Sequence, residues 1–555
     1  MTKVAAIGLD AAEWHFIEEL LGNGALPNLA RLRQKSAECR LRSEQKFPGD
    51  HVWQTFLSGT QDQDSGLGII GFDPETYEAY QRGASSRPVF YSGCPIKAIA
   101  FDVPYLSLAG LDQDVRVCTW GSHYWSYPRS ARPAGLLNEI DMRFGCHPAF
   151  GKEHDCAWYS PRFVSWLISS LDAGSERRVS IATWLQSRFS DWDLFLTTMS
   201  ETHPAGECFG HVVDGEHPLN ASPLATLHRE SLVKVYQSID RAVGRFAAEL
   251  PTDTMLVVFS LHGITSNHGD LPSMVLLPEL LYRFSFRKQL MRGPDYREWK
   301  SNGYPVVTPS GRWDHHMRAY FPNIVPKLKN WLVRMLPESV IEGVRLMEAR
   351  LKQPHHAQRP IWVATRETDC EPDDIGEPRA SLSWAVPCWY ERYWSRMKVF
   401  ALPSFDDGFI RINLRGRERN GIINLDDYKS VCDEVESCIT ACRNPRTGCP
   451  VVEEVIRTPG NPLDPTRPVA DIVVRWAGGV DAFKHAELGL IGPFPFKRTG
   501  GHTSHGFAFI SGPGIRRADL GEHRAIDLPP TILALLGREP PFKLSGRPFL
   551  RASGC

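Results

Sequence analysis

The sequence predicts an α/β fold with a mainly parallel central sheet and helices on both faces. Two observations support this prediction: short apolar runs recur along the chain, and helix-like segments separate them. Apolar runs of about four to eight residues are typical of parallel strands buried on both faces. Strands that alternate with helices form a parallel sheet, because each helix carries the chain back across one face of that sheet.

The first predicted strand, at 4–9 (VAAIGL), ends at Asp10, and a helix-like segment follows it. A helical pattern over 224–250 precedes the last strand of this part of the chain. Ligands of open α/β sheets bind at the carboxyl ends of the strands, which is where Asp10 lies. The further strands of this part are predicted at 96–101, 194–199 and 255–260.

The composition of the sequence changes after residue 270. Residues 271–395 are rich in proline and aromatic residues, with a helix expected at about 326–352. We therefore expect an insertion or cap at 271–395, and one large catalytic domain formed by 1–270 and 396–555. Strand-like sequence returns at 397–402 and 409–414.

Composition and charge disfavour several functional classes. The 555 residues include 63 Lys and Arg against 64 Asp and Glu, and the resulting net charge of -1 disfavours electrostatic binding of nucleic acid. The 13 cysteines form no C-x-x-C pair, which fits a reducing compartment better than a disulfide framework or a thiolate zinc ribbon. No secretory signal is visible, and no apolar stretch approaches the roughly 20 residues that span a bilayer. We expect a cytoplasmic protein with no nucleic-acid or membrane partner.

Polar stretches next to the predicted strands carry the residues suited to chemistry, and they should meet at one edge of the sheet. One of them, SETHPAGECFGH, spaces His203, Glu207 and His211 four residues apart, which places them on one face of a helix. Imidazole nitrogen and carboxylate oxygen suit Zn²⁺, and a catalytic zinc site commonly takes three protein ligands and one water. Taken alone the spacing is a weak signal, because a histidine in such a position is more often a hydrogen-bonded structural residue.

The order of these stretches resembles the alkaline phosphatase superfamily, in its type I phosphodiesterase/nucleotide pyrophosphatase branch. The matching sequence motifs are GLD with ALPNLARL, WQTFLSG, FSLHG, GGHTSHGFAFISGPGI, and DLPPTILALLG followed by SGRPF. They extend from residue 7 to residue 549, with the middle insertion outside the match. The resemblance implies an alkaline-phosphatase-like fold, hydrolysis of phosphoric esters, and two divalent metal ions bridged by the substrate phosphate.

Transferred residue by residue, the resemblance places metal ligands at Asp10, His262 and His502. One of the two metal sites then departs from the family pattern. Its Thr or Ser nucleophile falls on Gly49, and one of its aspartate ligands is replaced by Leu261. These two positions put the hydrolysis of phosphoric esters itself in doubt.

The other metal site changes its ligand types but keeps three donors, His203, Glu207 and His502. This set is complete for one catalytic Zn²⁺ with an open water position, with Mn or Fe as alternative metals. A metal lowers the pKa of its bound water from about 16 to roughly 7, so no covalent nucleophile would be required. We therefore predict a metal-dependent hydrolase that uses a metal-bound water.

His262, Glu201 and Asp10 are the predicted catalytic side chains. His262 or Glu201 would move protons, and Asp10 would orient His262 or hold a substrate hydroxyl or amine. Two interpretations stay open for three other histidines, a place in the pocket or a purely structural role. These histidines are His51, His211 and His268.

We expect a small-molecule substrate, and basic residues of the insertion favour an anionic one, although a solvated helix face explains them equally well. Two alternative functions stay open. The altered site also fits a non-hydrolytic enzyme of specialised metabolism, of isomerase, lyase or transferase type, and it fits a catalytically inactive binding protein. The basic residues are Arg312, Arg318, Lys327, Lys329 and Arg334.

Overall fold

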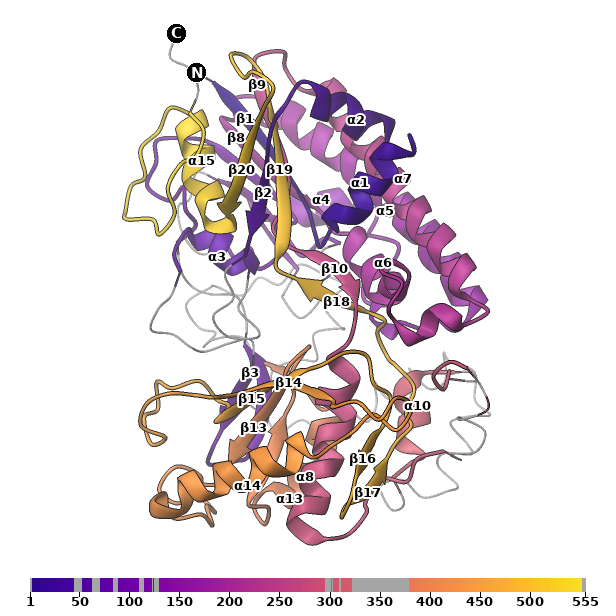
Figure 1. Cartoon of the computed structure of the whole chain (residues 1–555). Helices are drawn as coiled ribbons and strands as arrows, with labels where there is room; N and C mark the ends of the chain where they lie inside the picture. The colour runs from indigo at the N-terminus through magenta and orange to yellow at the C-terminus, as the bar shows by residue number, and fades with distance from the viewer. Residues whose placement is uncertain are drawn as a thin grey trace.

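The computed structural model (Figure 1) describes residues 2–43, 52–61, 70–82, 88–108, 114–121, 123, 129–294, 301, 303–308, 311–321 and 379–551. The predicted helix at 326–352, Gly49 and His51 lie outside these residues. Figure 1 shows two lobes, one built on a nine-stranded sheet and the other on a smaller antiparallel sheet. Among the described helices, none is both long and apolar enough to cross a membrane.

Nine strands form the central sheet: β1 (Lys3–Leu9), β2 (Ala37–Arg42), β5 (Ala98–Phe101), β6 (Val115–Cys118), β7 (Ser130–Arg132), β8 (Leu194–Met199), β9 (Thr254–Ser260), β19 (His505–Ser511) and β20 (Ala518–Arg524). Their order is β20-β2-β19-β9-β1-β8-β5-β6-β7. The strands from β9 to β6 are parallel, whereas β19 runs antiparallel to both of its neighbours and β7 runs antiparallel to β6. The predicted α/β class with a mainly parallel sheet is confirmed.

Helices cover both faces of this sheet, as the alternation of side chains along β1 requires (Figure 1). Ile7 belongs to the apolar core on one face, and Ala6 belongs to the core on the other face. Because both faces are buried, the strand reads as a continuous apolar run. The first face is covered by α1 (Trp14–Gly22), α2 (Pro27–Gln34), α4 (Leu136–Phe144), α5 (Pro161–Arg188) and α7 (Ala225–Glu249), and the second by α3 (Val52–Ser58) and α15 (Leu528–Leu535).

The second lobe centres on an antiparallel sheet of β12 (Val399–Leu402), β13 (Gly408–Ile412), β15 (Ile472–Trp476) and β14 (Val452–Arg457), in that order. The strands predicted at 397–402 and 409–414 are therefore present, but they pair with each other and not with the central sheet. Around them lie β3 (Ile70–Asp73), β4 (Glu78–Arg82), β11 (Arg379–Ser381), β16 (Phe483–His485), β17 (Gly489–Ile491), α8 (Leu277–Phe286), α10 (Trp313–Arg318), α13 (Glu391–Trp394) and α14 (Tyr428–Thr440). This lobe also includes strands from within 1–270 and 396–555. The predicted domain division at 271–395 stays a prediction.

A two-stranded ribbon of β10 (Gly263–Ser266) and β18 (Gly500–Thr503) extends from the central sheet toward the second lobe (Figure 1). It lies against the short helix α6 (Thr202–Phe209), which follows β8. A Cβ atom at Gly500 would lie only 2.0 Å from the carbonyl oxygen of Gly206, so glycine at 500 permits this close approach. The ribbon and α6 together position most of the polar residues described next.

Candidate active site

Three neighbouring parallel strands place the predicted polar residues at one edge of the central sheet. Asp10 directly follows β1, and His262 lies just after β9. His203 lies in the first turn of α6, which begins a few residues after β8. The strand order β9-β1-β8 brings together side chains that are far apart in the sequence, as the sheet-edge argument predicted.

Asp10 lies at the centre of this group and is fully buried. Its Oδ2 is 2.9 Å from Nδ1 of His203, and its Oδ1 accepts a hydrogen bond from Nε1 of Trp53 at 2.7 Å. Nε2 of His262 lies 3.4 Å from the same Oδ1. Burial alone would raise the pKa of the Asp10 carboxyl, but the contacts with His203 and His262 hold it below its usual range. Asp10 is therefore an ionised acceptor for ring N–H groups.

The second nitrogen of His203 faces two further predicted residues. Its Nε2 lies 3.2 Å from Nε2 of His502, a half-buried residue on β18 that pairs with Ile264 of β10. The same Nε2 lies 3.8 Å from Oε1 of Glu207, one helical turn further along α6. Burial lowers the pKa of both His203 and His502, so both rings are neutral near pH 7.

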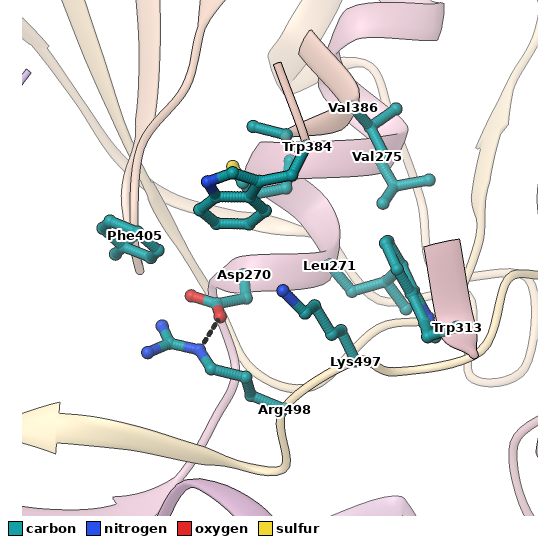
Figure 2. A pocket seen from close by; sticks show the side chains of 11 residues that line it. Asp270, Leu271, Val275, Trp313, Trp384, Val386, Phe405, Lys497 and Arg498 are labelled. Atoms are coloured by element: carbon teal, nitrogen blue, oxygen red, sulfur yellow. Dashed lines mark hydrogen bonds and ion pairs between the residues drawn. The ribbon is translucent and has the colours of Figure 1, made fainter. Parts of the chain in front are cut away.

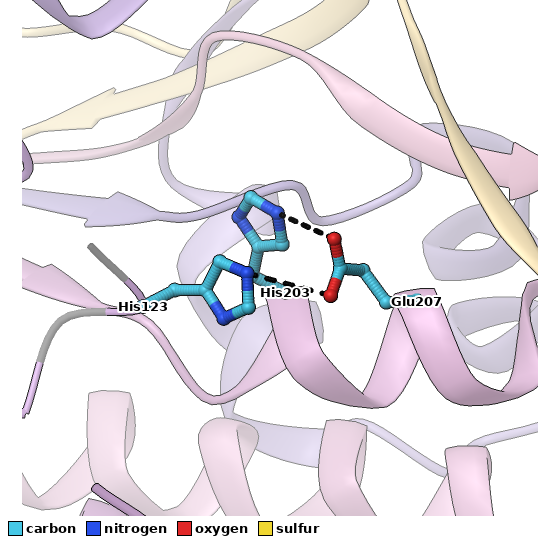
Figure 3. A group of neighbouring side chains, drawn as sticks. All are labelled: His123, His203 and Glu207. Atoms are coloured by element: carbon cyan, nitrogen blue, oxygen red, sulfur yellow. Dashed lines mark ion pairs between the residues drawn. The ribbon is translucent and has the colours of Figure 1, made fainter. Parts of the chain in front are cut away.

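His123 is a member of this group that the sequence interpretation missed. Its Nε2 is 3.4 Å from Oε2 of Glu207, and its ring stacks on that of His203 with centroids 4.1 Å apart (Figure 3). Ligand-type atoms of His123, His203 and Glu207 all lie within 4.8 Å of one another. The available signal was positional, because His123 follows β6, another parallel strand of the central sheet.

Arg498 places a permanent positive charge beside this group. Its Nη1 pairs with Oε1 of Glu207, and its Nε lies 2.6 Å from Oδ2 of Asp270. Burial raises the pKa of a carboxyl group, but Arg498 and His123 hold the pKa of Glu207 well below its usual range. The remaining Nη2 of Arg498 is buried and has no hydrogen-bond partner among the described residues.

Glu201 lies in a different network, formed around a fully buried arginine of α5. Arg178 donates from Nε to Oε1 of Glu201 at 3.0 Å and from Nη1 to Oδ2 of Asp102 at 2.6 Å. Nε2 of His147 lies 3.2 Å from the same Oε1 of Glu201. Burial raises the pKa of Glu201, but Arg178 and His147 outweigh that effect and lower it to about 2. A carboxylate held in this way is a poor proton acceptor near neutral pH, and the proton-transfer role of Glu201 stays a prediction.

Two other predicted histidines, His211 and His268, and the residue Leu261 make contacts that are structural. His211 lies beyond the end of α6, and its Nε2 is 3.1 Å from Nδ1 of His228, whose Nε2 is 2.9 Å from the carbonyl oxygen of Trp158. His268 stacks on His217 with ring centroids 5.8 Å apart. Leu261 is fully buried in an apolar core and offers no metal ligand.

A pocket of about 420 Å³, counting the part open to solvent, is lined in part by Arg498 and Asp270 (Figure 2). Its apolar walls include Trp384, Trp313 and Phe405. Nζ of Lys497 lies 4.1 Å from the centroid of the Trp384 ring, and the guanidinium carbon of Arg498 lies 4.9 Å from that of Phe405. The pocket therefore combines aromatic surface with two basic side chains, one of which also contacts the histidine and glutamate group.

No curated protein sequence matches this chain. Among solved structures, human ectonucleotide pyrophosphatase/phosphodiesterase 5 is 10% identical over 98% of this chain and 97% of its own, with a TM-score of 0.46. Phosphonoacetate hydrolase from Sinorhizobium meliloti 1021, solved in complex with phosphonoacetate, is 12% identical over 95% of this chain and 94% of its own, with a TM-score of 0.42.

A sequence model of one family covers more than half of the chain. The model is that of type I phosphodiesterase/nucleotide pyrophosphatase, and it matches residues 4–323. This range contains β1, β8 and β9 and the polar residues Asp10, His203, Glu207 and His262. The chain belongs to the type I phosphodiesterase/nucleotide pyrophosphatase family, within the alkaline phosphatase superfamily.

Proposed function

We propose that the protein is a metal-dependent hydrolase of small anionic phosphoric esters, with a divalent ion held by His203, Glu207 and His502. Water, and not a side-chain hydroxyl, is the nucleophile. The observation that carries the proposal is the convergence of three donors at the sheet edge: two neutral imidazole nitrogens 3.2 Å apart, with a carboxylate oxygen 3.8 Å from one of them.

These donors fit a zinc-type ion. Two imidazole nitrogens that each lie about 2.0–2.1 Å from a tetrahedral zinc are about 3.3 Å apart, close to the distance between His203 and His502. The Asp10 carboxylate accepts the Nδ1–H of His203, an arrangement that fixes the ring with its Nε2 facing His502 and Glu207. Asp10 thus supports the site as a positioning residue, and a direct ligand role for Asp10 and His262 stays a prediction.

A divalent ion at this site would act as a Lewis acid and would lower the pKa of a coordinated water to near 7. The side chains around it have separate tasks. Nη2 of Arg498, which has no hydrogen-bond partner among the described residues, is placed to donate to an anionic oxygen of the substrate, where charge builds up during the reaction. Nδ1 of His262 is buried without a hydrogen-bond partner in the described structure, so it is available to take or give a proton near the leaving oxygen.

The pocket in Figure 2 suits the non-reacting part of the substrate. Its aromatic walls favour an apolar or aromatic alcohol group, and Lys497 adds a second positive charge to that of Arg498. The whole chain has a net charge of only -1, so attraction for an anion comes from these local groups and the metal.

A second candidate function is a binding protein that does not hydrolyse its ligand. One contact favours it: the Arg498 guanidinium already pairs with Glu207 and supplies a positive charge where the metal would lie. In that case Arg498 replaces the metal, and added metal has no effect on ligand binding.

Metal-dependent hydrolysis separates the two candidates. Protein stripped with a chelator should hydrolyse bis(4-nitrophenyl) phosphate or 4-nitrophenyl phosphate only after Zn²⁺, Mn²⁺ or Fe²⁺ is restored. His203→Ala and His502→Ala should lose this activity, whereas His523→Ala, which changes a histidine stacked on Phe549, should keep it. Absence of metal-dependent turnover in correctly folded protein would contradict the proposal. A chiral phosphorothioate diester should react with inversion at phosphorus, because a covalent enzyme intermediate gives retention.

A further inference from the structure

A second set of donor side chains lies beside Glu207, around His123. Glu153 and His154 belong to the 3-10 turn at Glu153–Asp155, and Nε2 of His154 is 3.5 Å from Oε1 of Glu153. The rings of His123 and His154 have centroids 4.3 Å apart. Ligand-type atoms of His123, Glu153 and His154 all lie within 4.8 Å of one another.

Glu153 is the unusual member of this set. It is only 4% exposed, and its Oε2 has no hydrogen-bond partner among the described residues. An unpartnered carboxylate oxygen in a buried position is costly, and the cost is removed when a cation binds there. Two imidazoles and one carboxylate are ligands that favour Zn²⁺ and related transition metals over Ca²⁺ or Mg²⁺.

The donors around Glu207 are too many for one catalytic ion. His123, His203, Glu207 and His502 together would fill a tetrahedral ion and leave no open position for water. Divided between two ions, these four donors together with Glu153 and His154 make two sites of three ligands each. One consists of His203, Glu207 and His502, and the other of His123, Glu153 and His154.

We propose that His123, Glu153 and His154 bind a second divalent transition-metal ion next to the one at His203, Glu207 and His502. This inference rests on the proposed function, which supplies the first ion. The site differs from the second metal position that the family resemblance implies, which involves Asp10, Gly49, Leu261 and His262. Glu207 lies between the two ions, with Oε1 3.8 Å from Nε2 of His203 and Oε2 3.4 Å from Nε2 of His123.

Zinc stoichiometry tests this second site independently of activity. The full-length protein is stripped of metal, dialysed against buffered Zn²⁺ and measured by mass spectrometry of the metal content. The wild-type protein should bind two ions per chain, and Glu153→Gln and His154→Asn should each bind one. Glu153→Gln keeps the shape of the side chain and removes its charge, so the variant should fold. Glu230→Gln, which changes an exposed glutamate of α7, should still bind two ions.

The outcomes distinguish failure of this inference from failure of the proposed function. One ion in the wild-type protein, lost in His502→Ala but kept in Glu153→Gln, would overturn the second site and leave the proposed function intact. Two ions in both Glu153→Gln and His154→Asn would also overturn it. No bound ion in the wild-type protein, or one ion lost in Glu153→Gln but kept in His502→Ala, would overturn the proposed function.

Discussion

Replacing Asp10 by asparagine tests how the sheet edge prepares His203 for metal binding. The wild-type carboxylate accepts ring N–H groups on both oxygens, from His203 on Oδ2 and from Trp53 on Oδ1. In Asp10→Asn one oxygen becomes an NH₂ group, which cannot accept those hydrogen bonds. The variant therefore either loses the Trp53 contact or turns its NH₂ group toward His203, which releases the Nδ1–H of that ring.

The expected loss of metal affinity follows from this role. Removing the carboxylate partner of a metal-binding histidine typically weakens metal binding by about 10–100-fold. That range corresponds to about 1.4–2.8 kcal/mol. A direct metal ligand would cost more, because the ion loses a bond and not only the orientation of a ring. Asp10→Asn should therefore weaken zinc binding measurably and still bind zinc more tightly than His203→Ala.

Competition with a chromophoric zinc chelator at pH 7.5 measures this difference, with circular dichroism as the check on folding. Trp53→Phe is the matched control, because it removes one donor to Asp10 and leaves the contact with His203 in place. It should lose less affinity than Asp10→Asn. Unchanged zinc affinity in Asp10→Asn would refute the positioning role, and a loss equal to that of His203→Ala would show that Asp10 is itself a ligand.

Three further predictions concern stability and substrate binding. Arg178→Met removes the arginine partner of two buried carboxylates, Asp102 and Glu201, and should lower the free energy of unfolding by about 3–5 kcal/mol. By contrast, Arg188→Met breaks an exposed pair and should cost about 1 kcal/mol or less, so equal losses in urea titrations would contradict the buried network. Burial lowers the pKa of His228 to about 4, below the value of about 6.5 that it has in the unfolded chain. The stability that depends on a neutral His228 is complete above about pH 6.5 and is lost as the pH falls toward 4, so it should be about 2 kcal/mol smaller at pH 5 than at pH 7.5. A His228→Gln variant whose free energy of unfolding has the same pH dependence as that of the wild type would contradict this. Trp384→Leu should raise KM for 4-nitrophenyl phosphate more than for methyl phosphate and leave kcat nearly unchanged, and equal effects on both substrates would rule out the pocket as the aryl site.

The sequence predicted the central sheet well, because apolar runs buried on both faces are a local signal. β8 and β9 fall where such runs occur, and α7 matches the helical pattern that precedes β9. The second lobe was harder to predict, since β12, β13 and β15 have the same apolar character as strands of the main sheet. Only their pairing partners distinguish them, and pairing is a long-range property.

The candidate site was predictable where a residue directly follows a strand or lies on the helix after it. Asp10, His203, Glu207 and His262 fit that rule, and the structure brings them together with His502. His123 was missed because its strand, β6, is short and no spacing pattern surrounds the histidine. The partners of Glu201 were missed for another reason. Arg178 lies 23 positions away on a long helix, and nothing in the local sequence shows which carboxylate it pairs with.

Anomalous diffraction at the zinc edge from crystals of zinc-loaded protein tests the proposed ligand set most directly. The proposal predicts an anomalous peak bonded to Nε2 of His203, to Nε2 of His502 and to a carboxylate oxygen of Glu207, at about 2.0–2.2 Å. A peak on Asp10 and His262 without His203, or no peak while Arg498 keeps its contact with Glu207, would contradict it.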